Sequence, residues 1–239
     1  MRLLMPMGAI AVALCVNDAA VLFNITNALA QNAPITDCDQ LAAHPNDPER
    51  KVDGIPLSKL DTSKAVPACE TAVRQYPNDA RLSYQLARAY YSAKNYQDAI
   101  DQFRKAAEQE YAPAQYTLGL IYTRGWGGVA KDEAQAVAWF RKAAEQGHAQ
   151  AQDSLGSMYQ MGVGVAQDYA EAVTWYRKAA EQGYAAAQNN LGSMYLNGRG
   201  VSQDDAEAVS WYRKAAEQGY GPAQGYLWIL GATGRAGAH

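Results

Sequence analysis

Residues 175–183 read Trp-Tyr-Arg-Lys-Ala-Ala-Glu-Gln-Gly, and nearly the same stretch begins at Trp139 and again at Trp211. These two copies lie 36 residues before and 36 residues after the first. A degenerate copy begins at Gln102 and lacks both the Trp and the closing Gly. A fixed period of about 20 to 50 residues is the signature of a repeat array, in which each unit contacts mainly its neighbours.

One unit, residues 149–184, contains two predicted helices joined by a glycine turn. Apolar residues at helical spacing predict a first helix over about 149–161. Gly162 then permits the positive φ of a tight connection, and Asp168 is a suitable cap for a second helix that ends at Gly183. Neither helix can bury its apolar stripe alone, so the units must stack. The sequence therefore predicts an all-α solenoid of helix-turn-helix repeats.

The repeated pattern also resembles a known family. It reads A-x-A-Q-x-x-L-G-x-x-Y, then G-x-G-V, then D-x-A-E-A-V-x-W-Y-R-K-A-A-E-Q-G, and it is similar to the Sel-one-like repeat (SLR) subclass of the tetratricopeptide repeats (TPR). The copies fill residues 112–148, 149–184 and 185–220, and residues 80–111 resemble an ordinary TPR. The resemblance implies a right-handed superhelix and a protein-interaction scaffold rather than one particular chemistry.

The ends of the array are expected to be capped, because a terminal unit lacks one neighbour. Residues 31–79 are expected to form the N-terminal cap, with helices over about 36–43 and 66–76. Residues 221–231 repeat the start of a first helix without a second one, which predicts a C-terminal capping helix. Residues 232–239 are expected to be a flexible tail.

The N-terminal residues 1–30 are typical of an export signal, with Arg2, an apolar stretch and Ala-Leu-Ala before Gln31. An uncleaved amphipathic N-terminus or a membrane anchor is the alternative. A spanning anchor needs about 18 or more continuous apolar residues, and Asn17 and Asp18 interrupt this stretch. We therefore expect a periplasmic or secreted protein with no stable membrane span after cleavage.

Two cysteines, Cys38 and Cys69, remain after the predicted signal. A single pair in an exported chain predicts a disulfide, which would clamp the Pro-rich and Asp-rich segment between them. Two unrelated reduced thiols are the alternative.

Composition and motifs bear on the class of partner. The chain has 239 residues, 49% hydrophobic and 19% charged, which is ordinary for a globular protein. Its net charge of −3 and the lack of a basic run argue against a nucleic-acid partner. The three histidines, His44, His148 and His239, form no metal-binding motif, so we expect no metal and no cofactor.

The resemblance to TPR arrays implies a concave groove lined by the first helix of each repeat. Partner contacts are then expected two residues before, two after and five after the consensus Leu. In this chain those positions are Tyr84, Arg88, Tyr91, Tyr116, Leu120, Thr123, Asp153, Ser157, Gln160, Asn189, Ser193 and Leu196. An extended peptide or protein segment would fit such a lining. A merely solvated surface is the alternative.

Two further features concern packing. Gly119, Gly156 and Gly192 lie in the middle of predicted helices, where Gly costs about 1 kcal/mol relative to Ala, which indicates close approach of a neighbouring helix. Trp126 lies in an irregular glycine-rich connection. We interpret it as a plug over the helix ends rather than an exposed contact.

These observations predict a non-enzymatic periplasmic scaffold or adaptor that binds a protein or peptide. The resemblance also suggests a sharper form, a regulator of an envelope protein or of a sensor kinase. The alternative is a cell-wall-directed enzyme or ligand-binding protein of the penicillin-binding or β-lactamase kind, to which cysteine-rich relatives have been linked. No Ser is followed three residues later by Lys, and S-D-N, K-T-G and G-x-S-x-G do not occur. We therefore expect no catalytic residue.

Overall fold

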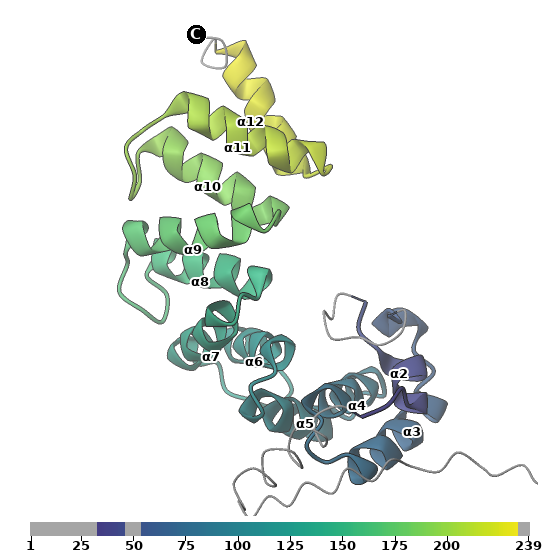
Figure 1. Ribbon diagram of the computed structural model, residues 1–239. Coiled ribbons are helices and arrows are strands. Elements are labelled where there is room, and N and C mark those ends of the chain that lie inside the picture. Colours follow the sequence, from purple (N-terminus) through teal and green to yellow (C-terminus); the bar gives the residue numbers. More distant parts are fainter. Residues whose placement is uncertain (1–32, 46–53, 234–239) are drawn as a thin grey trace, which may run out of the picture.

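The computed structural model describes residues 33–45 and 54–233, and Figure 1 shows its ribbon. Within these ranges the chain contains eleven α-helices and one 3-10 turn and no strand, so the predicted all-α class is confirmed. In chain order the elements are α2 (Asp37–Ala42), η1 (Leu57–Lys59), α3 (Thr62–Gln75), α4 (Ala80–Ser92), α5 (Tyr96–Glu108), α6 (Ala112–Arg124), α7 (Glu133–Glu145), α8 (Ala149–Met161), α9 (Tyr169–Glu181), α10 (Ala185–Asn197), α11 (Asp205–Glu217) and α12 (Gly221–Ala232).

The helices pack in chain order, each on the one before it and the one after it. Figure 1 shows α6 to α12 in one column and α2 to α5 turned away from its lower end, so the array is curved. The buried residues form a series of apolar clusters along the array rather than one central core. This one-dimensional packing is that of an α-solenoid.

The three helix pairs α6–α7, α8–α9 and α10–α11 are held by the same close contact between a glycine and an aromatic ring. The glycine lies on the first helix, where a Cβ atom would collide with the ring of the second. That Cβ would lie 2.4 Å from Phe140 at Gly119, 2.8 Å from Tyr176 at Gly156 and 3.0 Å from Tyr212 at Gly192. The close approach predicted for these glycines is therefore present.

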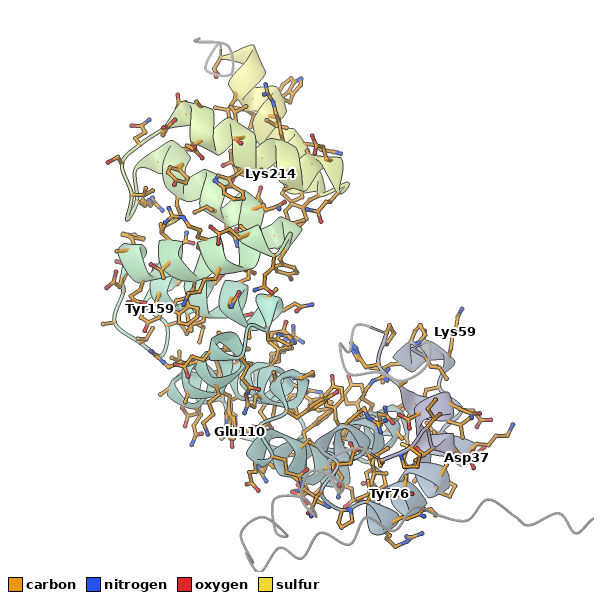
Figure 2. The ribbon with its side chains drawn as sticks, viewed as in Figure 1. Asp37, Lys59, Tyr76, Glu110, Tyr159 and Lys214 are labelled. Carbon is orange, nitrogen blue, oxygen red and sulfur yellow. A yellow bond between two sulfur atoms is a disulfide. The ribbon has the colours of Figure 1, made fainter. Side chains whose placement is uncertain are left out.

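The repeated tryptophans lie under lysine side chains of their own helices. Lys214, labelled in Figure 2, has its Nζ 3.9 Å from the centre of the Trp211 ring. The corresponding distance is 4.0 Å from Lys178 to Trp175. Such cation–π contacts cover rings that also pack against the apolar cluster, of which Trp175 is a buried member.

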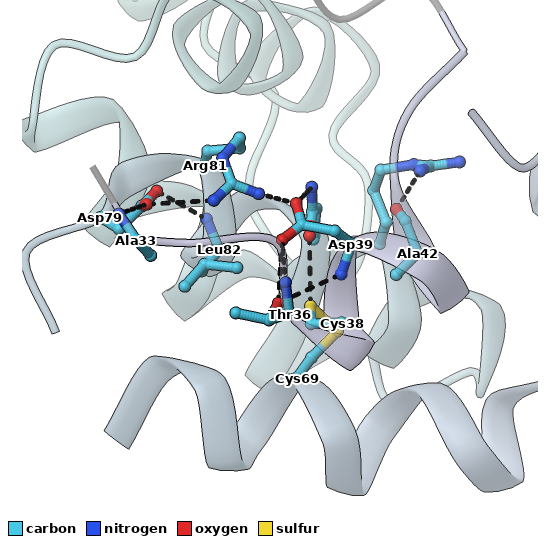
Figure 3. Close-up of polar contacts among 11 residues, drawn as sticks. Ala33, Thr36, Cys38, Asp39, Ala42, Cys69, Asp79, Arg81 and Leu82 are labelled. Atoms are coloured by element: carbon cyan, nitrogen blue, oxygen red, sulfur yellow. Dashed lines mark hydrogen bonds and ion pairs between the residues drawn. A yellow bond between two sulfur atoms is a disulfide. The ribbon is translucent and has the colours of Figure 1, made fainter. Parts of the chain in front are cut away.

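The N-terminal cap is held by a disulfide and by buried polar contacts (Figure 3). Cys38 on α2 and Cys69 on α3 are joined, with Cα atoms 4.5 Å apart, so the predicted disulfide is confirmed. Asp39 forms a capping box with Thr36, and its carboxylate also forms an ion pair with Arg81 on α4. Arg81 in turn pairs with Asp79 at 3.1 Å. The charges are nearly inaccessible to water, and each has an opposite partner.

Helix boundaries differ from the sequence prediction at two places. We predicted α3 from about residue 66, but it begins at Thr62, because the Asp61 carboxylate accepts a hydrogen bond from the Ser63 amide and caps it. Pro67 lies inside this helix rather than at its start. At the other end, α12 continues through Ala232, one residue beyond its predicted end. The predicted signal, residues 1–30, and tail residues 234–239 lie outside the described ranges.

Candidate partner-binding groove

Five of the predicted groove residues come together around one cavity of about 290 Å³, which we call the groove cavity. They belong to the first helices of two successive repeats, α4 and α6. These residues are Tyr84, Arg88, Tyr91, Tyr116 and Leu120. The cavity thus lies where the resemblance places partner contacts, over the N-terminal half of the array.

Sequence reasoning missed several further residues that line the groove cavity. His44 and Leu57 come from the N-terminal cap, Arg124 from the end of α6, and His148 and Gln150 from the start of α8. The periodic pattern of the sequence does not indicate that the cap reaches over the groove, because it begins only at residue 80.

Trp126 also lines the groove cavity. Its ring lies 4.6 Å from the Tyr91 ring and 5.0 Å from the Tyr96 ring, measured between centroids. It packs at the ends of α4 and α5, as the plug interpretation predicts, but it is only partly buried. One residue therefore closes the helix ends and supplies an apolar wall to the cavity.

Arg88 has a structural task as well as a place in the cavity wall. It is buried, and its guanidinium donates hydrogen bonds to the Ala42 carbonyl and, at 2.7 Å, to the Ile55 carbonyl. These two carbonyls lie on either side of the segment that the structure leaves undescribed. Arg88 thereby fixes the N-terminal cap beside the groove and carries a positive charge into the cavity wall.

The groove cavity has a positive and aromatic character. Among the described residues that line it, Arg88 and Arg124 are cationic and none is a carboxylate. Burial, helped by the nearby Arg88 charge, lowers the pKa of His44 to about 4. Burial likewise lowers the pKa of His148 to about 4, so both imidazoles are neutral at pH 7.

Beyond the groove cavity, the predicted residues of α8 and α10 are mostly engaged within their own repeats. The Tyr176 hydroxyl lies 3.0 Å from Ser157 Oγ and donates to Gln160 Oε1 at 2.6 Å. Ser193 Oγ lies 2.9 Å from the Tyr212 hydroxyl in the same way. These hydroxyls and amides mainly stabilise helix pairs, so they are less available to a partner.

The remaining predicted residues have mixed surroundings. Thr123 donates to the Gly119 carbonyl of its own helix at 2.7 Å. Leu196 packs against the C-terminal apolar cluster, and Asn189 is only 7% exposed. None of these three lines the groove cavity.

Asp153 is the one ionisable residue among the predicted positions of α8 and α10. Its carboxylate accepts a hydrogen bond of 2.8 Å from Asn190 Nδ2. Burial raises its pKa to about 6, although the Asn190 hydrogen bond opposes this shift. Asp153 forms no ion pair with any described residue.

The part of the chain that the structure describes offers neither a metal site nor a membrane span. In the described residues, no group of three His, Cys, Asp or Glu side chains could hold a metal ion. No helix in those residues combines the length and the hydropathy that crossing a bilayer requires.

Comparisons with known proteins agree with this geometry. The Sel1 repeat model matches residues 112–148, 149–184 and 185–220, and a tetratricopeptide repeat model matches residues 57–114. The latter match begins upstream of the predicted TPR-like repeat and includes part of the cap. No curated protein matches the chain.

Two solved structures are similar over most of the chain. One is a protective antigen of uropathogenic Escherichia coli with an SLR fold, 39% identical over 77% of this chain, with a TM-score of 0.68. This chain spans only 38% of that antigen's length. The other is a Sel1 repeat protein from Oxalobacter formigenes, 36% identical, with a TM-score of 0.68. That match covers 72% of this chain and 73% of the relative. The chain therefore belongs to the Sel1 repeat proteins, the SLR subclass of the tetratricopeptide repeat family.

Proposed function

We propose that this chain is a non-enzymatic periplasmic adaptor that holds a segment of a protein partner in the groove cavity and along the groove beyond it. Sel1 and tetratricopeptide repeat proteins are generally protein-interaction scaffolds. The observation that carries the proposal is the groove cavity itself, because residues of three successive repeats, a connecting loop and the cap converge on it.

The size and lining of the groove cavity favour a peptide segment over a small ligand. Its volume of about 290 Å³ lies at the lower limit of about 300 Å³ for small-molecule sites. Aromatic side chains give large contact areas and often dominate the binding energy of an interface. A cavity of this kind fits one bulky side chain of a partner whose backbone continues along the groove.

The disulfide supports the proposed location. Cys38 and Cys69 are both inaccessible to water and are joined. Disulfides persist in oxidising compartments and are rare in the cytosol, so this pair fits an extracytoplasmic location. In that compartment the groove could bind an envelope partner, such as the periplasmic domain of a sensor.

Site-specific photo-crosslinking in living cells tests the proposal. A photoreactive phenylalanine analogue is placed at Tyr91, in the cavity wall, and in a second strain at Met161, an apolar control position that is 60% exposed. We expect one partner to be crosslinked from Tyr91 and not from Met161. The purified partner should then bind this chain with one-to-one stoichiometry. The substitution Leu120→Ala should lower the affinity for this partner by more than about fivefold. Equal crosslinking from both positions would show that the groove is not the binding surface.

A further inference from the structure

Two opposite charges, Arg124 and Asp153, act on the groove surface at Tyr116. Its ring lines the groove cavity together with Arg124, eight residues further along α6. On α8, the His148 ring stacks on the Tyr116 ring with centroids 4.9 Å apart. Asp153 holds on α8 the position that Tyr116 holds on α6, two residues before the consensus Leu, so it lies at the next repeat along the groove. Arg124 and Asp153 act electrostatically on the Tyr116 hydroxyl in opposite directions. A ligand seated at Tyr116 therefore has a cation of the protein in the cavity wall and an anion on the next repeat.

Neither of these charges is neutralised within the described part of the chain. Arg124 is exposed at the wall of the cavity and forms no ion pair with a described residue. Asp153 has the Asn190 amide as its hydrogen-bond donor and no cation. Buried charges in proteins are normally paired, and this carboxylate is largely buried. Both groups are therefore available to charges that a partner brings.

Asp153 differs from the residues at the corresponding positions of the other repeats. Two residues before the consensus Leu, the other repeats have Tyr84, Tyr116 and Asn189, all of which are neutral at pH 7. A carboxylate at this position is thus not required by the repeat fold. Functional groups are often retained at a cost in stability, so a costly carboxylate at this position points to a ligand.

The aromatic walls define what lies between the two charges. Tyr84, Tyr91, Tyr116 and Trp126 face the groove cavity from α4, α6 and the connecting loop. Aromatic surroundings can also bind cations, but two arginines and the lack of a lining carboxylate oppose a cation inside this cavity. A planar apolar side chain is the occupant that these walls favour.

We propose that the groove binds a peptide segment in which an aromatic side chain lies between an acidic and a basic residue. The aromatic side chain fills the groove cavity, the acidic residue pairs with Arg124, and the basic residue pairs with Asp153. This inference rests on the proposed adaptor function and adds the chemistry of the recognised segment. The two opposite charges also fix the direction in which the segment lies.

Selection from a phage-displayed library of random nonapeptides on the immobilised full chain tests both levels of the proposal. We expect enrichment of peptides in which one aromatic residue is flanked by an acidic residue on one side and a basic residue on the other, in a constant order. Enrichment of aromatic residues without a charge pattern would support the adaptor function but overturn this inference. Failure to enrich any sequence would contradict the adaptor function itself.

Charge variants then assign each end of the selected peptide. With synthetic peptides, replacing the basic residue by Gln should weaken binding about fivefold or more, since Asp153 is largely buried, and the effect should vanish in Asp153→Asn. Replacing the acidic residue of the peptide should lower the affinity only about two- to threefold, because Arg124 is exposed. In the Arg124→Glu variant the chain should instead prefer a basic residue at this end of the peptide. Glu145→Gln, an equal charge change on the exposed side of α7, is the control. An unchanged preference in Asp153→Asn would overturn the assignment.

Discussion

Asn190 of α10 donates a hydrogen bond of 2.8 Å to the carboxylate of Asp153 on α8, and so joins the first helices of two successive repeats. At the preceding step, His148 at the start of α8 stacks on Tyr116 of α6, with ring centroids 4.9 Å apart. The α8 segment therefore contacts the first helices of both the preceding and the following repeat. The link at Asp153 differs in that it includes a charge, whose burial raises the carboxyl pKa to about 6.

The substitution Asp153→Asn is expected to stabilise the protein at pH 7. The pKa of Asp153 is raised from 3.8 to about 6, so the folded state binds the proton more tightly than the unfolded state. Its contribution to stability is full below about pH 4 and is lost as the pH rises through 6. At about 1.36 kcal/mol per pKa unit, the loss amounts to about 3 kcal/mol at most.

Asn keeps an oxygen that can accept from Asn190 and removes the charge. Urea denaturation of both proteins at pH 4 and pH 7.5 measures the difference in unfolding free energy between variant and wild type. The titration of other groups affects both proteins equally and cancels in this difference. The variant should gain up to about 3 kcal/mol over the wild type at pH 7.5 relative to the difference at pH 4. A difference that does not change with pH would show that Asp153 is not buried as described.

Alanine substitutions at two helical glycines are expected to act in opposite directions. A Cβ at Gly156 would lie 2.8 Å from the Tyr176 ring and 3.2 Å from the Ala172 carbonyl oxygen. Gly156→Ala should therefore destabilise by about 1 to 3 kcal/mol through overpacking. Gly225 on α12 has nothing within 4 Å of such an atom, so Gly225→Ala should stabilise by up to about 1 kcal/mol. Thermal unfolding followed by circular dichroism measures both, and the same sign at both positions would contradict this packing.

The disulfide is expected to support the groove as well as the cap. The Cys38–Cys69 bond closes a loop with a sequence separation of 31 residues, which corresponds to about 3 to 4 kcal/mol in the chain-entropy model. His44 and Leu57, which line the groove cavity, lie inside this loop. Replacing both cysteines by Ala should lower the stability by this amount and weaken peptide binding. Circular dichroism melts and fluorescence anisotropy test the two effects. Unchanged binding by the folded variant would exclude the cap from the site.

The repeats could be predicted closely from the sequence, because their packing is local and periodic. The first helix expected over 149–161 is α8, Ala149–Met161, and the glycine–aromatic contact recurs as expected. The cap was less predictable, since its contacts join residues far apart in the chain. Arg88 was predicted as a partner contact from its position alone, and only the structure shows that it also holds the Ala42 and Ile55 carbonyls. Which residues line the groove cavity depends on such long-range contacts, so the repeat pattern of the sequence does not reveal them.

The substitution Arg88→Met is expected to loosen the cap while leaving the repeats intact. Met retains much of the apolar stem but cannot donate to the Ala42 and Ile55 carbonyls. Hydrogen bonds from a charged donor contribute about 1.5 to 3 kcal/mol each, and buried carbonyls without a donor are costly. The amides of residues 54–60 should therefore exchange with deuterium at least about tenfold faster, whereas those of α8 to α11 should not change.

Hydrogen exchange followed by mass spectrometry resolves these segments separately. Arg104→Met serves as the control, because Arg104 lies on α5 in an exposed ion pair with Asp101 at 3.4 Å. Exposed pairs contribute about 0 to 1 kcal/mol, so this control should leave exchange in residues 54–60 unchanged. If Arg88→Met also leaves that exchange unchanged, the cap is held beside the groove by its disulfide and apolar contacts, without a need for the guanidinium.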